Sequence, residues 1–247
     1  MEIRSASDLC ALTLPCKPAF TPACNQGVSM EISFWLERWQ NGEIGFHRDA
    51  FNPALEAHWE KLEVEPPTTV FVPLCGKSRD MEWLARRGHQ VVGVELSELA
   101  IDAFMESQQL KPVQRQQDGF IVKSAGPYEI WCGDLFALPD QRMASVSAVY
   151  DRASLVALPP HLQSQYADWL KTNLPDAPAL IVSLAYDQTE MKGPPFSIPE
   201  VRVREILGDH YALKILASDD VIDDNAALRK RGLTGLHETV YLARSIP

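Results

Sequence analysis

The sequence has few of the features that mark secreted, membrane-spanning or metal-binding proteins. Cysteine is scarce and odd in number, five in 247 residues, and no two cysteines have the C-x-x-C spacing of zinc and redox sites. The six histidines form no H-x-x-x-H or H-E-x-x-H pair, so no metal site is expected. The longest apolar runs, near residues 69–75 and 179–186, are far shorter than a membrane span. These absences favour a cytoplasmic protein with reduced thiols.

Two common enzyme motifs are also missing. The chain has no G-x-G-x-x-G loop, which a dinucleotide site needs so that the backbone can approach a pyrophosphate. This absence counts against NAD or FAD, and so against a dehydrogenase, but not against a nucleoside cofactor without phosphates. There is no G-x-S-x-G sequence either, which argues against a hydrolase of the common α/β kind.

The charge of the chain restricts its partners. Acidic residues outnumber basic residues by 33 to 23, which gives a formal net charge of −10. Such a protein repels phosphate backbones and anionic lipid, so we expect neither nucleic acid nor a membrane as a partner. Hydrophobic residues make up 46% of the chain, enough for a sizeable core. No coiled-coil pattern or large apolar patch demands an oligomer, so we expect a monomer.

The first 29 residues differ from the rest of the chain. They contain Cys10, Cys16 and Cys24, and neither a helical nor a strand periodicity runs through them. Their apolar stretch is too short for a signal peptide. We therefore expect residues 1–29 to be a disordered extension, or the product of an upstream start, and residues 30–247 to form a single domain.

From Met30 onward the chain shows regular helix and strand patterns. Trp35 and Trp39 lie four residues apart and share one face of a helix. Asn52 followed by a proline predicts the start of a second helix, and Ser97 is placed to cap another. Continuous apolar runs, typical of strands covered on both faces, occupy residues 69–74, 90–95, 146–150 and 179–186. Alternating strands and helices predict an α/β fold with a mainly parallel sheet.

Two pairs of strands are predicted to be antiparallel. Residues 120–122 and 128–131 flank a Gly-Pro turn and predict a hairpin. The two terminal apolar runs, residues 212–217 and 238–243, show no helical pattern between them. They predict an antiparallel pair that closes the sheet.

The residues that end the strands are the candidate functional site, because ligands in such sheets bind beyond the carboxyl ends of the strands. Glu95 ends the second strand, where a nucleotide-binding sheet holds ribose hydroxyls; an ordinary solvated glutamate is the alternative. Asp134 is placed either to accept a hydrogen bond from an adenine amino group or to cap a loop. Arg152 is placed to hold a carboxylate, or to pair with Asp151 at the surface.

Three other side chains each have two interpretations. Trp35 and Trp39 are more often core residues than a ligand platform. Cys75 suggests a nucleophile, but it has no histidine nearby in the sequence and follows an apolar run. A buried, inert thiol is the favoured interpretation of Cys75.

Several strings of residues, in order and spanning residues 30–247, resemble the thiopurine S-methyltransferase family. These are F-W-L-E-R-W at 34–39, G-F-H at 45–47, V-P-L-C-G-K-S at 72–78, G-V-E-L-S at 93–97, Y-D-R-A-S-L at 150–155, and Y-D at 186–187 with G-P-P-F at 193–196. The resemblance implies a class I S-adenosylmethionine-dependent methyltransferase fold, with a mainly parallel seven-stranded sheet and an antiparallel C-terminal pair.

The resemblance also implies which residues bind the cofactor, S-adenosylmethionine, whose product is S-adenosylhomocysteine. Trp39 would close over its amino-acid end and Leu74 would lie against it. Glu95 would bind its ribose hydroxyls. Asp134 and Leu135 would form the adenine-side pair.

For the methyl acceptor, the resemblance implies a small-molecule thiol. Arg152 would lie near both the cofactor's methionine moiety and the acceptor, and Phe46 would contact the acceptor ring. The family's mammalian members use an arginine near the C-terminus for the acceptor. Arg229, Lys230 and Arg231 occupy that region in this chain, and the sequence assigns none of them.

The resemblance predicts methyl transfer to the sulfur of a thiopurine or a related aromatic thiol by in-line displacement. Because aromatic thiols ionise readily, no general base is obligatory, and Asp187 is a weak candidate whose alternative is a loop cap. The other functions considered are a methyltransferase for selenium or tellurium oxyanions, halides or small thiols, linked to metalloid resistance, and a non-catalytic nucleotide-binding module.

Overall fold

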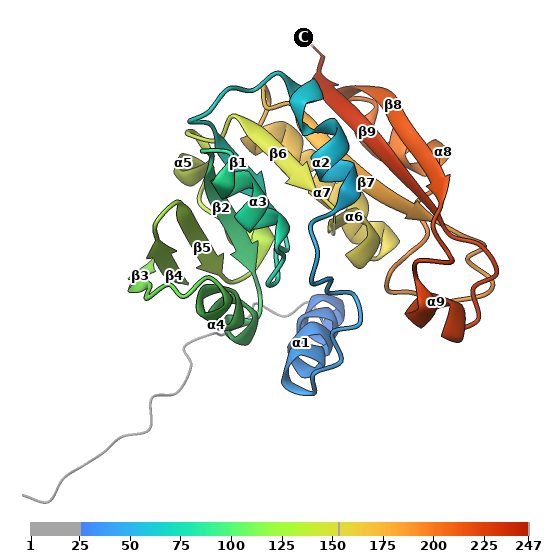
Figure 1. The fold of residues 1–247 in the computed structure, drawn as a ribbon, viewed down its shortest axis with the longest axis horizontal. Helices are drawn as coiled ribbons and strands as arrows, with labels where there is room; N and C mark the ends of the chain where they lie inside the picture. Colours follow the sequence, from blue (N-terminus) through green and yellow to red (C-terminus); the bar gives the residue numbers. More distant parts are fainter. Residues whose placement is uncertain (1–25, 153, 247) are drawn as a thin grey trace, which may run out of the picture.

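The protein is organised around one twisted sheet whose strands follow the predicted apolar runs (Figure 1). A computed structural model describes residues 26–152 and 154–246. Within these residues the sheet has nine strands, in the order β3-β4-β5-β2-β1-β6-β7-β9-β8. They are β1 (Thr69–Val72), β2 (Gln90–Glu95), β3 (Val113–Gln117), β4 (Phe120–Ala125), β5 (Tyr128–Cys132), β6 (Ala148–Asp151), β7 (Ala179–Ala185), β8 (Tyr211–Asp220) and β9 (His237–Ser245).

The helices lie between the strands, as the alternating pattern predicts. The α-helices are α1 (Gln26–Gln40), α2 (Pro53–His58), α3 (Asp80–Arg86), α4 (Glu98–Ser107), α5 (Asp140–Met143), α6 (Ser154–Ala157), α7 (Pro160–Asn173), α8 (Glu200–Leu207) and α9 (Ala226–Lys230). Two 3₁₀ turns, η1 (Trp59–Leu62) and η2 (Leu135–Ala137), complete the set within the described residues.

Two buried cores, one on each face of the sheet, hold these elements together. Leu55 of α2, Leu84 of α3 and Phe104 of α4 are fully buried against one face. Leu170 of α7 and Leu207 of α8 are fully buried against the other. Because both faces are covered, the central strands read as continuous apolar runs and not as alternating ones.

The strand connections create a switch point beside β1. On one side β1 pairs in parallel with β2, which pairs with β5. On its other side β1 pairs in parallel with β6, which pairs with β7. The five strands β5, β2, β1, β6 and β7 are parallel, so their carboxyl ends share one edge of the sheet. A crevice opens at this edge where two successive connections leave in opposite directions.

Most of the sequence-based expectations about elements are confirmed. The side-chain oxygen of Asn52 accepts a hydrogen bond from the backbone N–H of Ala54, 2.8 Å away, and so caps α2. Ser97 caps α4 through Ala100. The β4–β5 hairpin and the terminal β8–β9 pair are both antiparallel. The α/β fold class with helices on both faces is likewise confirmed.

Three details differ from the expectations. The sheet has nine strands within the described residues instead of the seven that the resemblance implies, and the edge strand β3, which pairs with β4, was not expected. A short helix, α9, lies between β8 and β9, where no helix was expected. Residues 26–29, expected to belong to a disordered extension, instead form the first turn of α1. The rest of the expected extension lies outside the described residues.

Candidate active site

Two adjoining cavities, of about 300 Å³ and about 290 Å³, lie beyond the carboxyl ends of the parallel strands. They form one trough, because both are lined by the same six residues: Trp35, Leu74, Glu95, Leu96, Ala157 and Pro194. The first cavity extends toward β6, β7 and β9, and the second toward the end of β5. The trough therefore follows the strand ends across the switch point.

Glu95 lies where the two cavities meet. Its carboxylate is only 7% exposed and accepts hydrogen bonds from the backbone N–H of Gly76 at 2.9 Å and of Ser97 at 2.8 Å. Burial raises the pKa of this carboxyl above its ordinary value, although the backbone donors act in the opposite direction. Each carboxylate oxygen keeps a further lone pair, and Glu95 lines both cavities, so the group can accept hydrogen bonds from two neighbouring hydroxyl groups.

The loop after β1 is strained where it lines the trough. Leu74 has a φ of +47°, a left-handed conformation that costs a non-glycine residue about 1–2 kcal/mol. Gly76 has a φ of +52°, and a Cβ atom there would come within 3.1 Å of the Trp39 ring. Trp39 therefore lies directly over the loop, close to Glu95.

An aromatic cluster forms the wall contributed by α1 and the segment after it. The ring centroid of Phe46 lies 5.7 Å from that of Trp35 and 5.5 Å from that of Trp39, both edge to face. The two tryptophans are half-buried and line the trough. Trp35 and Trp39 are therefore not core residues in this structure.

The second cavity contains the residues predicted for the adenine side. Asp134 and Leu135 both line it, at the end of β5. The carboxylate of Asp134 accepts a hydrogen bond from the backbone N–H of Phe136 at 3.0 Å and caps the η2 turn. Asp134 therefore caps a loop, as one of its two interpretations predicted, and its second carboxylate oxygen is available to a ligand.

Arg152 lines the first cavity at the end of β6. Within residues 26–152 and 154–246 its guanidinium makes no hydrogen bond or ion pair, so the surface pair with Asp151 does not form. Asp151 is instead buried, and it accepts hydrogen bonds from the Tyr166 hydroxyl and the Ser154 backbone N–H. The buried aspartate anchors the start of α6 and fixes the backbone next to Arg152.

Asp187 lies apart from the other predicted site residues. It is exposed, it is not among the lining residues of either cavity, and its carboxylate accepts two hydrogen bonds from Thr189. These bonds lower the pKa of the Asp187 carboxyl. The structure thus places this residue in the loop-capping role that was the alternative to a base.

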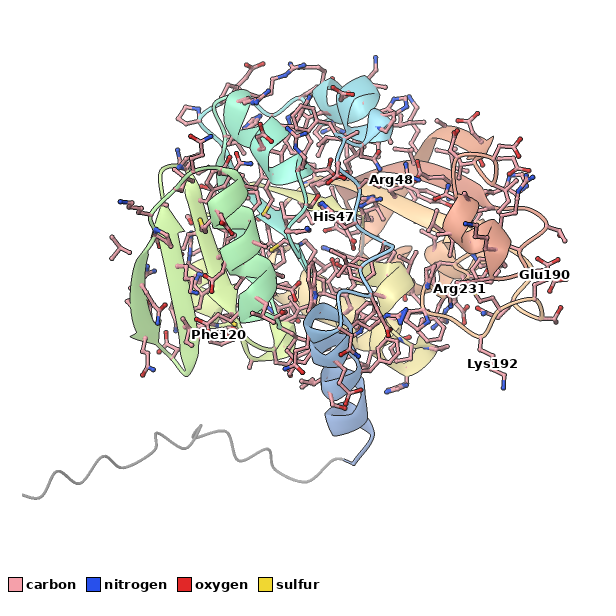
Figure 2. The ribbon with its side chains drawn as sticks, turned by 60° about the horizontal axis from the view of Figure 1, so that its bottom comes forward. His47, Arg48, Phe120, Glu190, Lys192 and Arg231 are labelled. Atoms are coloured by element: carbon pink, nitrogen blue, oxygen red, sulfur yellow. The ribbon has the colours of Figure 1, made fainter. Side chains whose placement is uncertain are left out.

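The structure distinguishes between the three basic residues near the C-terminus. Arg231 lines the first cavity and donates to the carbonyl of Pro194 at 3.1 Å. Arg229 instead pairs with Asp223 at the surface, and Lys230 is exposed. Figure 2 shows Phe120 and Arg231 on opposite sides of the molecule, with His47 and Arg48 between them.

Several residues of the first cavity were not identified from the sequence. Arg48 lies in the segment between α1 and α2 and donates to Asn225, next to α9, at 2.8 Å. Burial lowers the pKa of His47, and Lys77 adds to this effect. Burial raises the pKa of Glu238 at the start of β9. Only the G-F-H string at 45–47 pointed to this region, because contacts between segments so distant in sequence leave no local pattern.

Cys75 is buried, as expected. It is 5% exposed, and burial raises the pKa of its thiol well above the ordinary value, with the Glu95 carboxylate contributing in the same direction. A thiol that does not ionise is a poor nucleophile.

The trough fits a nucleoside cofactor without phosphates. Glu95 offers acceptors for a ribose, Asp134 an acceptor for an amino group, and Leu74 and Leu135 apolar surface for a flat ring. Among the described residues, no three potential ligands cluster as a metal site would require. Nor does any helix in the part that the structure describes have the length and apolar character to cross a membrane.

A nucleoside trough at the switch point of such a sheet is the arrangement of class I S-adenosylmethionine-dependent methyltransferases. The structure of Burkholderia thailandensis 1,6-didemethyltoxoflavin-N1-methyltransferase, solved with S-adenosylhomocysteine, matches with a TM-score of 0.62 at 18% identity, covering 93% of this chain and 94% of that one. Magnesium protoporphyrin IX methyltransferase from Synechocystis matches with a TM-score of 0.54 at 13% identity, covering 87% of this chain and 100% of that one. Both likenesses concern the fold.

Comparison with protein families gives the narrower assignment. The family model for thiopurine S-methyltransferase matches residues 30–245. The thiopurine S-methyltransferase of Pseudomonas fluorescens is 44% identical over 217 residues, which cover 88% of this chain and 100% of that protein. The Nitrosospira multiformis protein of the same name is 43% identical over 214 residues, covering 86% and 97%. The chain belongs to the thiopurine S-methyltransferase family and is an S-adenosylmethionine-dependent methyltransferase.

Proposed function

We propose that this enzyme transfers a methyl group from S-adenosylmethionine to the sulfur of a thiopurine or a related aromatic thiol by in-line displacement. The observation that carries the proposal is the 44% identity, over the full length of the Pseudomonas fluorescens protein, to an enzyme named for this reaction. The trough supports it, because one cavity suits a nucleoside and the adjoining one has room for a second small molecule.

The cofactor end of the trough is assigned to residues from β1, β2, β5 and α1. Glu95 binds the ribose hydroxyls through its carboxylate, and Asp134 with Leu135 contacts the adenine. Leu74 and Trp39 enclose the amino-acid end. Bound here, S-adenosylmethionine supplies an electrophilic methyl group on a sulfonium sulfur.

The acceptor end lies over β6, β7 and β9. Phe46 offers the edge of its ring to a flat acceptor, and Leu184 offers apolar surface at the end of β7. Arg152 and Arg231 bring positive charge to this end, which favours the thiolate over the thiol. Phe46 also packs edge to face on Trp39 and on Trp35, the tryptophan that lines both cavities.

The catalytic demand on the protein is mainly alignment. An ionised aromatic thiol is already a competent nucleophile, so the protein has to hold it at near-attack distance and does not have to remove a proton in the same step. The exposed, loop-bonded Asp187 is consistent with this mechanism, because it lies outside the cavities.

The test is a methyl-transfer assay with 6-mercaptopurine, selenite and tellurite as alternative acceptors, together with calorimetric titration of S-adenosylhomocysteine. We expect methylation of 6-mercaptopurine and binding of S-adenosylhomocysteine. Transfer to selenite or tellurite alone would instead establish the oxyanion function. Binding without transfer to any acceptor would identify a nucleotide-binding module.

A further inference from the structure

One end of the first cavity contains none of the residues that the proposed function assigns to the cofactor. It lies at the carboxyl ends of β6 and β7 and at the start of β9, and is lined by Tyr150, Val182 and Glu238, with Arg48 and Arg152 close by. Because the strand order places the Glu95 and Asp134 ends on the opposite side of β1, this end belongs to the methyl acceptor.

Asn52 contributes an unusual group to this end. The residue is 1% exposed and lines the first cavity. Its backbone N–H donates to Asp80 Oδ1 at 2.8 Å, and its side-chain Oδ1 accepts from the backbone N–H of Ala54 at 2.8 Å. Its side-chain Nδ2 has no hydrogen-bond partner among the described residues.

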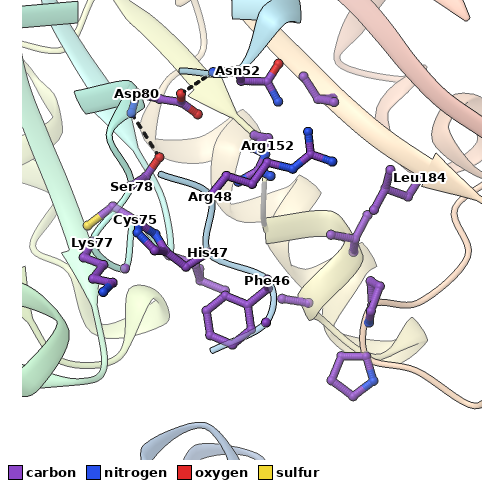
Figure 3. A pocket seen from close by; sticks show the side chains of 18 of the residues that line it. Phe46, His47, Arg48, Asn52, Cys75, Lys77, Ser78, Asp80, Arg152 and Leu184 are labelled. Carbon is purple, nitrogen blue, oxygen red and sulfur yellow. Dashed lines mark hydrogen bonds between the residues drawn. The ribbon is translucent and has the colours of Figure 1, made fainter. Parts of the chain in front are cut away.

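The orientation of this amide is fixed by its other contacts. Since the Ala54 N–H can only donate, the amide atom facing it must be the oxygen, and the nitrogen must point the other way. Figure 3 shows the amide nitrogen of Asn52 turned away from Asp80, toward the side of the cavity where Arg152 lies.

The capping of α2 does not explain why this residue is an asparagine. Serine would cap the helix about as well as asparagine does, whereas aspartate would add a buried charge beside Asp80. Neither would place an N–H₂ group in the cavity wall. A buried donor without a partner costs about 1–3 kcal/mol, and native proteins seldom retain one without a reason. A ligand oxygen within hydrogen-bond distance would satisfy this donor.

We infer that Asn52 Nδ2 donates a hydrogen bond to an oxygen of the methyl acceptor, away from its sulfur, and with Arg152 selects aromatic thiols that carry a carboxylate. This inference rests on the proposed function. It adds a specificity-determining residue and a second recognised group on the acceptor.

The charges around this end favour an anionic oxygen over a neutral one. Arg48 and Arg152 are both positive. The carboxylate of Asp80 is already engaged by the Asn52 backbone and by the Tyr150 hydroxyl at 2.9 Å. Glu238 faces these arginines too; burial raises the pKa of its carboxyl, although Arg152 and Arg48 act in the opposite direction.

The experiment compares thiophenol with 2-, 3- and 4-mercaptobenzoate as acceptors for the wild-type enzyme, Asn52→Ser and Asn52→Asp. Both substitutions keep an oxygen for the cap, and Asn52→Asp keeps the size of the side chain. We expect the kcat/KM of the wild type to be higher for at least one mercaptobenzoate than for thiophenol, and the ratio of these two values measures the preference. That ratio should fall about tenfold in Asn52→Ser and further in Asn52→Asp, which presents an acceptor to an anion.

A second measurement does not depend on turnover. Benzoate is titrated into wild-type protein saturated with S-adenosylhomocysteine, and the side-chain ¹⁵N–H₂ signals of Asn52, assigned by their absence in Asn52→Ser, are followed. We expect these signals to move with a saturating curve. An unchanged acceptor ratio in both variants, or Asn52 signals that benzoate does not shift, would overturn the inference.

The control separates this inference from the proposed function. If S-adenosylhomocysteine binds about tenfold more weakly in the variants while the acceptor ratio is constant, the amide holds the cofactor and the inference is wrong. If the wild type methylates no aromatic thiol at all, the proposed function fails. The benzoate titration still decides whether the Asn52 amide binds a carboxylate.

Discussion

At the scale of single residues, Glu95 combines a structural contact with a proposed ligand contact in one carboxylate. Two backbone donors, from Gly76 and Ser97, hold it in place, while burial raises its pKa. Ligand hydroxyls that donate to the carboxylate stabilise its ionised form, so binding of a ribose offsets part of the cost of burying the charge.

Glu95→Gln should weaken the binding of S-adenosylhomocysteine by about tenfold or more, since hydrogen bonds to a charged acceptor contribute about 1.5–3 kcal/mol. It should also lower the melting temperature of the ligand-free protein, because the amide nitrogen would face a backbone N–H. Calorimetric titration and thermal unfolding measure the two effects. Glu106→Gln, at an exposed position of α4, is the matched control. Affinity equal to that of the wild type would remove Glu95 from the site.

The raised pKa of Glu95 also sets the sign of a pH dependence. The affinity for S-adenosylhomocysteine should fall as the pH drops through the folded-state pKa, because a protonated carboxyl loses an acceptor. In the ligand-free protein the contribution of this group to stability has the opposite trend. It becomes more favourable as the pH falls from the raised pKa toward 4.5, the ordinary value, because the folded state then binds more protons than the unfolded state.

Asp187 provides the test of proton handling. Asp187→Asn should reduce kcat/KM less than tenfold, because the carboxylate lies outside the cavities and its lowered pKa makes it a weak base. With wild-type enzyme, the pH profile should follow the thiol ionisation of whichever acceptor is used, and should shift between acceptors of different acidity. A loss of several hundredfold, with a limb that stays at one pH for all acceptors, would make Asp187 the base.

At the scale of elements, the β4–β5 hairpin shapes the second cavity. Gly133 follows β5, and a Cβ atom there would lie 2.5 Å from a carbon of the Phe120 ring on β4. Phe120 is itself buried and stacks edge to face on Trp131 at 5.5 Å. The close approach of the ring to the backbone therefore determines where Asp134 begins the wall of the cavity.

Gly133→Ala should lower the free energy of unfolding by about 1–3 kcal/mol, the usual cost of overpacking. Phe120→Leu removes the obstructing ring, so the double variant should lose less stability than the sum of the two single variants. Urea denaturation of the four proteins measures this coupling. Strict additivity would show that the ring and the added methyl group do not meet.

The elements also show what the sequence could and could not predict. The bounds of β2 follow from its apolar run, and the starts of α2 and α4 from Asn52 and Ser97. The edge strand β3 has no such pattern, because its sequence V-Q-R-Q-Q is polar and mostly exposed. The short helix α9 could not be predicted for a similar reason. None of its residues is buried, so its sequence has no apolar stripe from which a helix could be predicted. Because the helix was not predicted, the neighbouring Arg231 was left unassigned.

At the scale of the whole molecule, the strand order decides which distant residues meet. The strand-end residues Glu95, Asp134 and Arg152 could be predicted as a group, because parallel strands share one edge. The pairing of Arg48 with Asn225 could not, since it joins segments 177 residues apart. The left-handed backbone of Leu74 and the unpaired nitrogen of Asn52 likewise depend on the surrounding packing and not on a local pattern.

A chain that begins at Met30 should fold and function like the full chain. The family match starts at this residue, and the aromatic side chains of α1 that line the trough, Trp35 and Trp39, lie beyond it. Thermal unfolding and the methyl-transfer assay, run in parallel on both chains, check the expectation. A large fall in melting temperature or activity would show that residues 1–29 contribute to the domain.

The position of α1 has a consequence for turnover. No described side chain of this helix belongs to the buried cores, and Figure 1 shows it standing below the sheet, next to α4. Its aromatic side chains face the trough instead, so under the proposed assignment a bound cofactor would form part of the surface on which the helix docks. Cofactor affinity and helix docking are then thermodynamically linked. Under that assignment, we expect local opening of α1 to release spent cofactor while the sheet stays folded.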